Sequence, residues 1–169
     1  SSVFGNNATG VIGEGVAAQN NNGTWMGSLS NVDPLDGYWV MVDQGITLSI
    51  DGEPEYDLTY NLHEGANLIS FTGDDGTDIE NALSGYEGMI TGVIGEGVAS
   101  SYMNGNWAGS LNAFQRNKGY WVMTTQAIND PPFQYGTSQA QSTSGFTYMD
   151  ISFPKMDQET LLYQNPSNG

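Results

Sequence analysis

The sequence predicts an all-β fold, a tandem repeat of two small antiparallel units that are sandwich-like or barrel-like. Residues 9–17 and 91–99 both read TGVIGEGVA, and the alignment runs on at the same offset of 82 without a gap to residues 41 and 123. Of these 33 aligned positions 20 are identical, which indicates a duplicated unit. The chain also contains 23 glycines, and turn residues separate its short apolar stretches, as in β proteins.

Each copy contains the signals of a β meander. The GEG tripeptides lack the lysine and the following helix of a phosphate-binding loop, so they predict a tight turn or bulge. The Asn-Gly pairs at 22–23 and 104–105 precede a tryptophan and predict hairpin turns. The GYWVM segments at 37–41 and 119–123 predict a strand with tyrosine and valine on one face and tryptophan and methionine on the other.

Further elements are expected between the two copies. Apolar alternation predicts strands over residues 46–50, 58–62 and 67–71. Residues 78–86 read DIENALSGY and predict one or two helical turns, with Asp78 as the N-cap and Gly85 as the stop.

The phase of the repeat predicts an incomplete first unit and a spare strand at the C-terminus. Copy two follows the strand expected at 67–71, whereas only eight residues precede copy one. The same offset places Ile69-Ser70-Phe71 on Ile151-Ser152-Phe153. We therefore expect a partial first repeat (1–56), a complete second repeat (57–135) and a tail (136–169) that carries a candidate donor strand.

The composition indicates an extracellular protein. There are 19 acidic residues and 3 basic ones, so nucleic acid and anionic membranes are poor partners. No apolar run approaches the ~20 residues of a membrane span. Cysteine is absent, which excludes disulfides and thiolate metal sites. The abrupt start at Ser1 fits a mature product after signal cleavage.

Residues 65–70 (GANLIS), the tryptophan after each Asn-Gly turn and the two GYWV segments together resemble a repeated module of secreted bacterial and archaeal surface proteins. Its usual pattern is GWNLISxP, then a tryptophan after a short turn, then GKGYWV. Ala66 stands where tryptophan is usual and Thr72 where proline is usual, although Pro154 follows the ISF of the tail. The resemblance implies a surface location and transfers no catalytic residue.

No constellation of side chains predicts catalysis, so we expect no enzyme. His63 is the single histidine, and neither a cysteine nor a Gly-x-Ser-x-Gly elbow exists to pair with it. Carboxylate pairs of the glycosidase kind always exist among 19 acids, so an extracellular hydrolase stays the third alternative.

Calcium is the cofactor that the acidic turns favour. Asp74, Asp75, Asp78 and Glu80 lie within seven residues of a glycine-containing loop, and hard cations prefer several oxygen ligands at close range. A second cluster begins at Asp51 in DGEPEYD. The competing interpretation is a solvated acidic loop in which Asp78 only caps a turn.

The functional expectation is an extracellular structural subunit that binds copies of itself head to tail, as in a filament, tube or surface layer. The first unit should expose a sheet edge, and exposed edges recruit strands. The expected assembly strand contains Phe146, Tyr148, Ile151, Ser152 and Phe153. This tail either folds back on its own copy one or inserts into the next subunit, and we favour the second.

The alternative is an adhesion or carbohydrate-binding module excised from a larger exported protein. Its sugar platform would consist of the repeated aromatic residues, although their repetition favours a packing role first. These aromatic residues are Trp25, Trp107, Tyr38, Trp39, Tyr120 and Trp121.

Overall fold

The structure is a computed structural model that describes residue 4 and residues 8–50, 57–136 and 149–153, without side chains for residues 46–50 and 149–153. The described residues form thirteen strands and one short helix, so the all-β prediction is confirmed. The strands of copy one are β1 (Ala8–Gly13), β2 (Val16–Asn21), β3 (Thr24–Gly27), β4 (Trp39–Val42) and β5 (Ile46–Ile50). Then follow β6 (Tyr60–Leu62), β7 (Gly65–Ser70), α1 (Ile79–Ala82), β8 (Ile90–Gly95), β9 (Val98–Met103), β10 (Asn106–Gly109), β11 (Gly119–Thr124), β12 (Ile128–Phe133) and β13 (Met149–Phe153).

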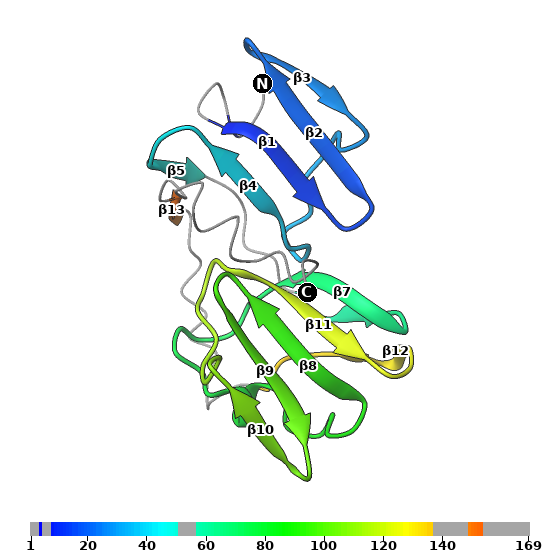
Figure 1. The fold of residues 1–169 in the computed structure, drawn as a ribbon. Helices are drawn as coiled ribbons and strands as arrows, with labels where there is room; N and C mark the ends of the chain where they lie inside the picture. Colours follow the sequence, from blue (N-terminus) through cyan, green and yellow to red (C-terminus); the bar gives the residue numbers. More distant parts are fainter. Residues whose placement is uncertain (1–3, 5–7, 51–56, 137–148, 154–169) are drawn as a thin grey trace, which may run out of the picture.

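Each copy forms its own antiparallel sheet, and Figure 1 shows the two sheets one above the other. The first sheet has the order β3-β2-β1-β4, and the second has the order β10-β9-β8-β11-β7. The second sheet therefore equals the first plus one strand, β7, added beside β11. Two further pairs, β12 with β6 and β13 with β5, complete the described part of the fold.

The two copies agree in register as well as in strand order. Gly10 lies opposite Gln19 in the first sheet and Gly92 opposite Ser101 in the second, at the offset of 82. The register shift between the first strand and the GYWV strand also recurs at the equivalent residues. Trp25 lies opposite Asn20, and Trp107 lies opposite Tyr102. The duplication in sequence is thus a duplication in structure.

The turns form where the sequence predicts them. Asn22 and Gly23 have φ angles of 51° and 90°, and Asn104 and Gly105 have 54° and 85°. Positive φ at both central residues is the geometry whose twist matches paired strands, and Asn-Gly supplies it at little cost. The GEG tripeptide closes the β1–β2 turn with Gly15 at φ 68°.

Copy two contains the main hydrophobic core. Its sheet is covered on one face by β6, β12 and α1, and the side chains of Phe114, Phe133 and Val122 are fully buried. The helix α1 forms one of the one or two predicted turns and ends before Gly85, and Asp78 is its N-cap, which accepts a hydrogen bond from the Glu80 N–H at 2.9 Å. Its Ile79 and Ala82 face the core.

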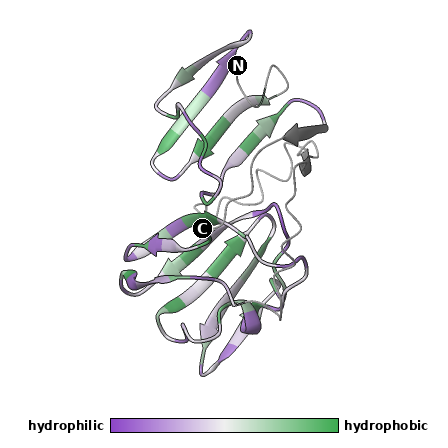
Figure 2. Ribbon diagram, turned by 180° about the vertical axis from the view of Figure 1, so that it is seen from behind, coloured by the Kyte–Doolittle hydropathy of each residue, from purple (hydrophilic) through white to green (hydrophobic). Residues whose placement is uncertain are grey.

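Copy one repeats the sheet, and part of the equivalent face is buried there as well, since Ala8 and Val11 are each 1% exposed. Val32, which is equivalent to the buried Phe114, is 42% exposed, and Tyr38 and Val40 are only half-buried, unlike Tyr120 and Val122. Hydrophobic residues recur along the strands of both sheets (Figure 2). The part of this face around Val32 is therefore more exposed in copy one than the equivalent part is in copy two.

The tail strand lies in copy one of its own chain. β13 pairs with β5 from Phe153 opposite Ile46 to Met149 opposite Ile50. In copy two the equivalent of β5 is β12, and its partner is β6. The tail strand therefore occupies the place beside β5 and not the place beside β4 that its resemblance to β7 predicts.

Candidate assembly interface

The strand β7 contacts both copies, one along each edge. Along its inner edge it pairs with β11 of copy two, with Tyr120 opposite Ile69. Along its outer edge it binds the segment of copy one that leads into β4. There the Gly37 N–H donates to the Leu68 carbonyl at 2.9 Å, and the Ser70 N–H donates to the Leu35 carbonyl at 2.8 Å. The opening strand of copy two is thus also the dock for copy one.

Glycine permits the close approach of the two copies at this dock. A Cβ on Gly37 would lie 2.9 Å from a methyl carbon of Leu68 and 3.1 Å from the Ile69 carbonyl oxygen. A Cβ on the equivalent Gly119 would lie 3.1 Å from the Gly37 Cα. Two equivalent glycines therefore meet at the junction, where any side chain would push the copies apart.

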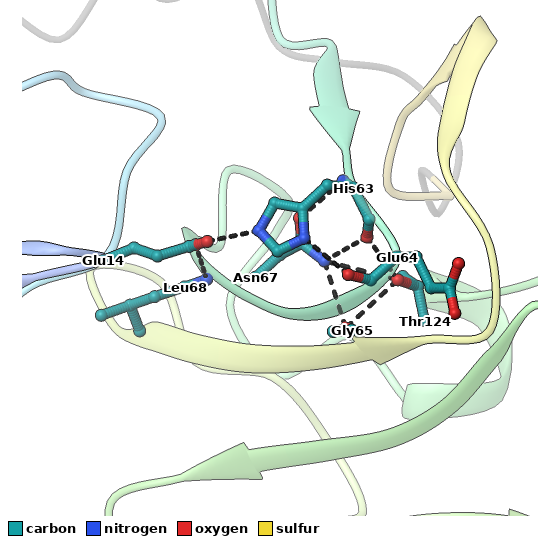
Figure 3. Close-up of polar contacts among 7 residues, drawn as sticks. All are labelled: Glu14, His63, Glu64, Gly65, Asn67, Leu68 and Thr124. Carbon is teal, nitrogen blue, oxygen red and sulfur yellow. Dashed lines mark hydrogen bonds and ion pairs between the residues drawn. The ribbon is translucent and has the colours of Figure 1, made fainter.

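A carboxylate from the first β turn completes the junction (Figure 3). Glu14 extends from the β1–β2 turn, and its Oε2 accepts a hydrogen bond from the Leu68 N–H at 2.8 Å. Its Oε1 contacts the Nε2 atom of His63. One acidic side chain of copy one thus binds the backbone of β7 and the turn that precedes it.

Copy two holds His63 in position through its own polar network (Figure 3). The Asn67 side chain accepts from the His63 N–H at 2.9 Å and donates to the His63 carbonyl at 2.9 Å. The Thr124 hydroxyl donates to the Gly65 carbonyl at 3.1 Å and contacts the His63 carbonyl at 2.5 Å. Asn67 and Thr124 are both buried, so the turn between β6 and β7 is fixed from inside.

The contacts of His63 require its charged form. Nδ1 lies 2.7 Å from the Glu64 carbonyl oxygen, and Nε2 faces the Glu14 carboxylate, so both ring nitrogens face acceptors. Only the imidazolium donates from both nitrogens. The hydrogen bond to Glu14, followed by that to the Glu64 carbonyl, raises the pKa of His63.

The equivalent glutamate of copy two has a different partner. Glu96 pairs with Lys118 at 3.1 Å on the protein surface. The residue equivalent to Lys118 in copy one is Asp36, which offers Glu14 no positive charge. The two turns thus have the same sequence, but Glu96 forms an ion pair within copy two, whereas Glu14 of copy one binds copy two.

The outer edge of β4 has no strand beside it among the described residues. In copy two the Phe71 N–H donates to the Lys118 carbonyl at 3.0 Å. Backbone hydrogen-bonding groups alternate in direction along a strand, so the N–H and C=O groups of Tyr120 and Val122 also point toward β7. The equivalent Tyr38 and Val40 direct their backbone N–H and C=O groups toward the open edge of β4. The repeat phase predicts an acceptor at this edge, and strand exchange stays a prediction.

A depression of about 310 Å³ lies beside Tyr38, where this edge begins. It is lined by residues 28–33 together with Val16, Asp36 and Tyr38. Open backbone groups are what an added strand requires for its hydrogen bonds, and Val16, Leu29 and Val32 of the lining offer apolar contacts for its side chains.

The acidic residues predicted to bind calcium have protein partners in the structure. Asp74 pairs with the Arg116 guanidinium at 3.2 Å, and Asp75 accepts from the Arg116 N–H at 2.9 Å. Asp78 caps α1, and Glu80 is exposed in its first turn. Nowhere in residues 8–50 and 57–136 do three potential ligands gather. Asp51 lies outside the described residues, and calcium binding stays a prediction.

The assembly strand is described in part. Ile151, Ser152 and Phe153 belong to β13, whereas Phe146 and Tyr148 lie outside the described residues. The aromatic residues of the sugar hypothesis divide between the faces of the sheets: Tyr120 is buried, and Trp121 and Trp107 are half-buried. Trp107 contacts Tyr102 with ring centroids 5.4 Å apart. Packing therefore accounts for most of this set.

The roles of Glu14 and of residues 35–37 were not predicted from the sequence, and His63 was expected to be a loop residue without a role. One signal was available in the alignment, because the exchange of Lys118 for Asp36 leaves Glu14 without the partner that Glu96 has. The pairing with His63 is not readable from sequence, because 49 residues separate the two side chains.

The described part of the chain contains no helix long and apolar enough to cross a membrane. No protein-family model, no curated protein and no solved structure matches the chain.

Proposed function

We propose that this protein is an extracellular structural subunit that assembles head to tail by strand donation. The observation that carries the proposal is the difference between the two sheets. β11 has β7 at its outer edge, and among the described residues the equivalent β4 has no strand there. The tail carries the ISF tripeptide of β7 at the repeat offset, so each chain has one acceptor edge and one donor strand.

The order of the elements along the chain favours donation to a neighbour. β7 follows copy one in sequence, contacts copy one only by its outer edge and completes the sheet of the copy that comes after it. The tail follows copy two at the same offset, as β7 follows copy one. By analogy with β7, we infer that the tail strand completes the sheet of a copy in another chain, and repetition of such a heterologous contact produces a fibre.

The pairing of β13 with β5 fits this proposal as a stored state of the donor strand. It involves five residue pairs, and the outer edge of β4 then has no strand beside it among the described residues. Transfer to a neighbour exchanges these pairs for equivalent backbone hydrogen bonds beside β4 and adds apolar burial around the exposed Val32. Assembly then depends on protein concentration, since a contact within one chain competes with a contact between chains.

Two variants test the proposal in the full chain. Val40→Pro removes a backbone donor at the open edge, which only an incoming strand needs, and proline is tolerated at sheet edges. Deletion of residues 142–169 removes the donor. We expect the wild type to form fibres in electron micrographs and large species in sedimentation, and both variants to remain monomers. Val42→Ala is the matched control in β4, because it removes no hydrogen-bond donor.

Thermal melts must accompany these measurements, because a variant that fails to fold would also fail to assemble. A wild type that stays monomeric at high concentration contradicts the proposal. Unchanged assembly of a folded Val40→Pro variant contradicts it as well.

A further inference from the structure

Copy two contains a second element, besides β7, that has no counterpart in copy one among the described residues. Residues 76–79 precede and begin α1, and they lie along the segment 112–114. The Gly76 N–H donates to the Phe114 carbonyl at 2.9 Å, the Phe114 N–H to the Thr77 carbonyl at 2.8 Å, and the Ile79 N–H to the Asn112 carbonyl at 2.9 Å. Ile79 is buried by this contact at 4% exposure.

The equivalent segment of copy one forms the wall of the depression. Residues 30–32 correspond to residues 112–114, and all of them line the depression of about 310 Å³. Residues 28–33 with Tyr38 therefore form a receptor for an element like residues 76–79, and we call this depression the copy-one receptor. Val32 remains 42% exposed there, whereas Phe114 is completely buried.

The sequence that follows β13 aligns with this element at the repeat offset. Asp78, the N-cap of α1, corresponds to Thr160, and Ile79 corresponds to Leu161. Threonine is a favoured N-cap residue because its hydroxyl accepts from a backbone N–H of the first turn. Leucine retains the apolar character of the buried position. The exposed Glu80 corresponds to Leu162.

We propose that residues 157–163 of one chain dock in the copy-one receptor of the next chain, with Thr160 as the cap of a short helix and Leu161 as the buried anchor. This inference rests on the proposed function and extends it, because the donated unit becomes a strand followed by a helical turn. The donor then restores in copy one both elements that copy two possesses. Strand hydrogen bonds supply general affinity, and the Leu161 anchor fixes the register.

The absence of cysteine from the chain makes disulfide trapping a direct test. Asp78 lies opposite Ala113 in an antiparallel bridge, so the equivalent Thr160 should lie opposite Asn31 of the next chain. Residues paired in this way have Cα atoms about 5.5 Å apart or less, which is close enough for a disulfide. Chains carrying Asn31→Cys are mixed with chains carrying Thr160→Cys and oxidised at a concentration that permits assembly. Non-reducing electrophoresis then reports links between chains.

Two further mixtures make the outcome specific. Met123 lies opposite Ala66, so Met41→Cys with Tyr148→Cys reports the donated strand alone. Asn22→Cys with Thr160→Cys is the control, because Asn22 lies in the exposed β2–β3 turn. We expect linked dimers in the first two mixtures and none in the control.

Links from the strand pair without links from the Asn31–Thr160 pair would overturn the inference and leave the proposed function standing. Links from neither pair would remove the proposed function itself. A link that forms only within a double variant Asn31→Cys/Thr160→Cys would show that the tail fills its own copy one, which also overturns donation. As a second measurement, Leu161→Asp should abolish assembly, whereas Leu162→Asp should retain it.

Discussion

The contact between Glu14 and His63 predicts that the junction of the two copies weakens as pH rises. Both nitrogens of His63 face acceptors, so the contact exists only with the imidazolium. Its pKa in the folded protein is raised above the ordinary value of 6.5. A group of this kind stabilises the fold fully below the unfolded pKa, and the contribution disappears as pH rises through the folded pKa.

The size of this stabilisation follows from the exposure of the two side chains. The side chains of His63 and Glu14 are 59% and 38% exposed, so solvent screens their attraction. Exposed ion pairs contribute about 0.2–1 kcal/mol. For a chain of this size 1 kcal/mol corresponds to a shift of about 2–4 °C in melting temperature. We expect the wild type to lose up to about 1 kcal/mol between pH 5.5 and pH 8.5 through this contact alone.

The assay is denaturant unfolding at both pH values and constant ionic strength, for the wild type and Glu14→Gln. A glutamine still accepts from the Leu68 N–H, and its amide donates to the neutral imidazole, so this variant should lose the pH-dependent difference. Glu96→Gln is the matched control, since it removes the equivalent carboxylate of copy two, whose partner is Lys118 and not a histidine. Equal pH dependence of Glu14→Gln and the wild type would refute the reasoning.

Three further predictions concern stability, measured by denaturant unfolding at fixed pH. Phe114→Ala should lower the free energy of unfolding by about 3–5 kcal/mol because Phe114 is completely buried, whereas Val32→Ala at the equivalent exposed position should lower it by under about 1 kcal/mol. Similar losses in the two variants would contradict the difference in burial between the copies. Tyr135→Phe should be neutral or stabilising, since the buried Tyr135 hydroxyl has no hydrogen-bond partner among the described residues and its removal ends a desolvation cost of about 1–3 kcal/mol; a clear loss would reveal a partner. Thr124→Val should cost about 1–3 kcal/mol because the Gly65 and His63 carbonyls lose their donor, although the equivalent residue in copy one is Val42; an unchanged free energy of unfolding would show that Asn67 alone holds the turn.

The local elements could be predicted from the sequence because their causes are local. Asn-Gly dipeptides adopt positive φ at low cost, so both hairpins form at residues 22–23 and 104–105. Asp78 caps α1 because its carboxylate reaches the Glu80 N–H two residues away. The repeat offset of 82 predicted equal strand order and register, since identical residues at gapless spacing leave one favourable pairing. These features required no knowledge of contacts between distant segments.

The contacts between the two copies, and the different partners of equivalent residues in them, were decided by the tertiary structure. Glu14 and Glu96 occupy the same turn of the same repeat, yet one binds β7 and the other binds Lys118. Nothing local to residues 9–17 distinguishes them, because the difference arises from what lies beside each turn after folding. The position of β13 beside β5, and not beside β4, also depends on what the folded chain places nearby. Pairing along a strand edge uses backbone groups that every sequence shares, so the choice between two open edges depends on which one the folded chain brings within reach.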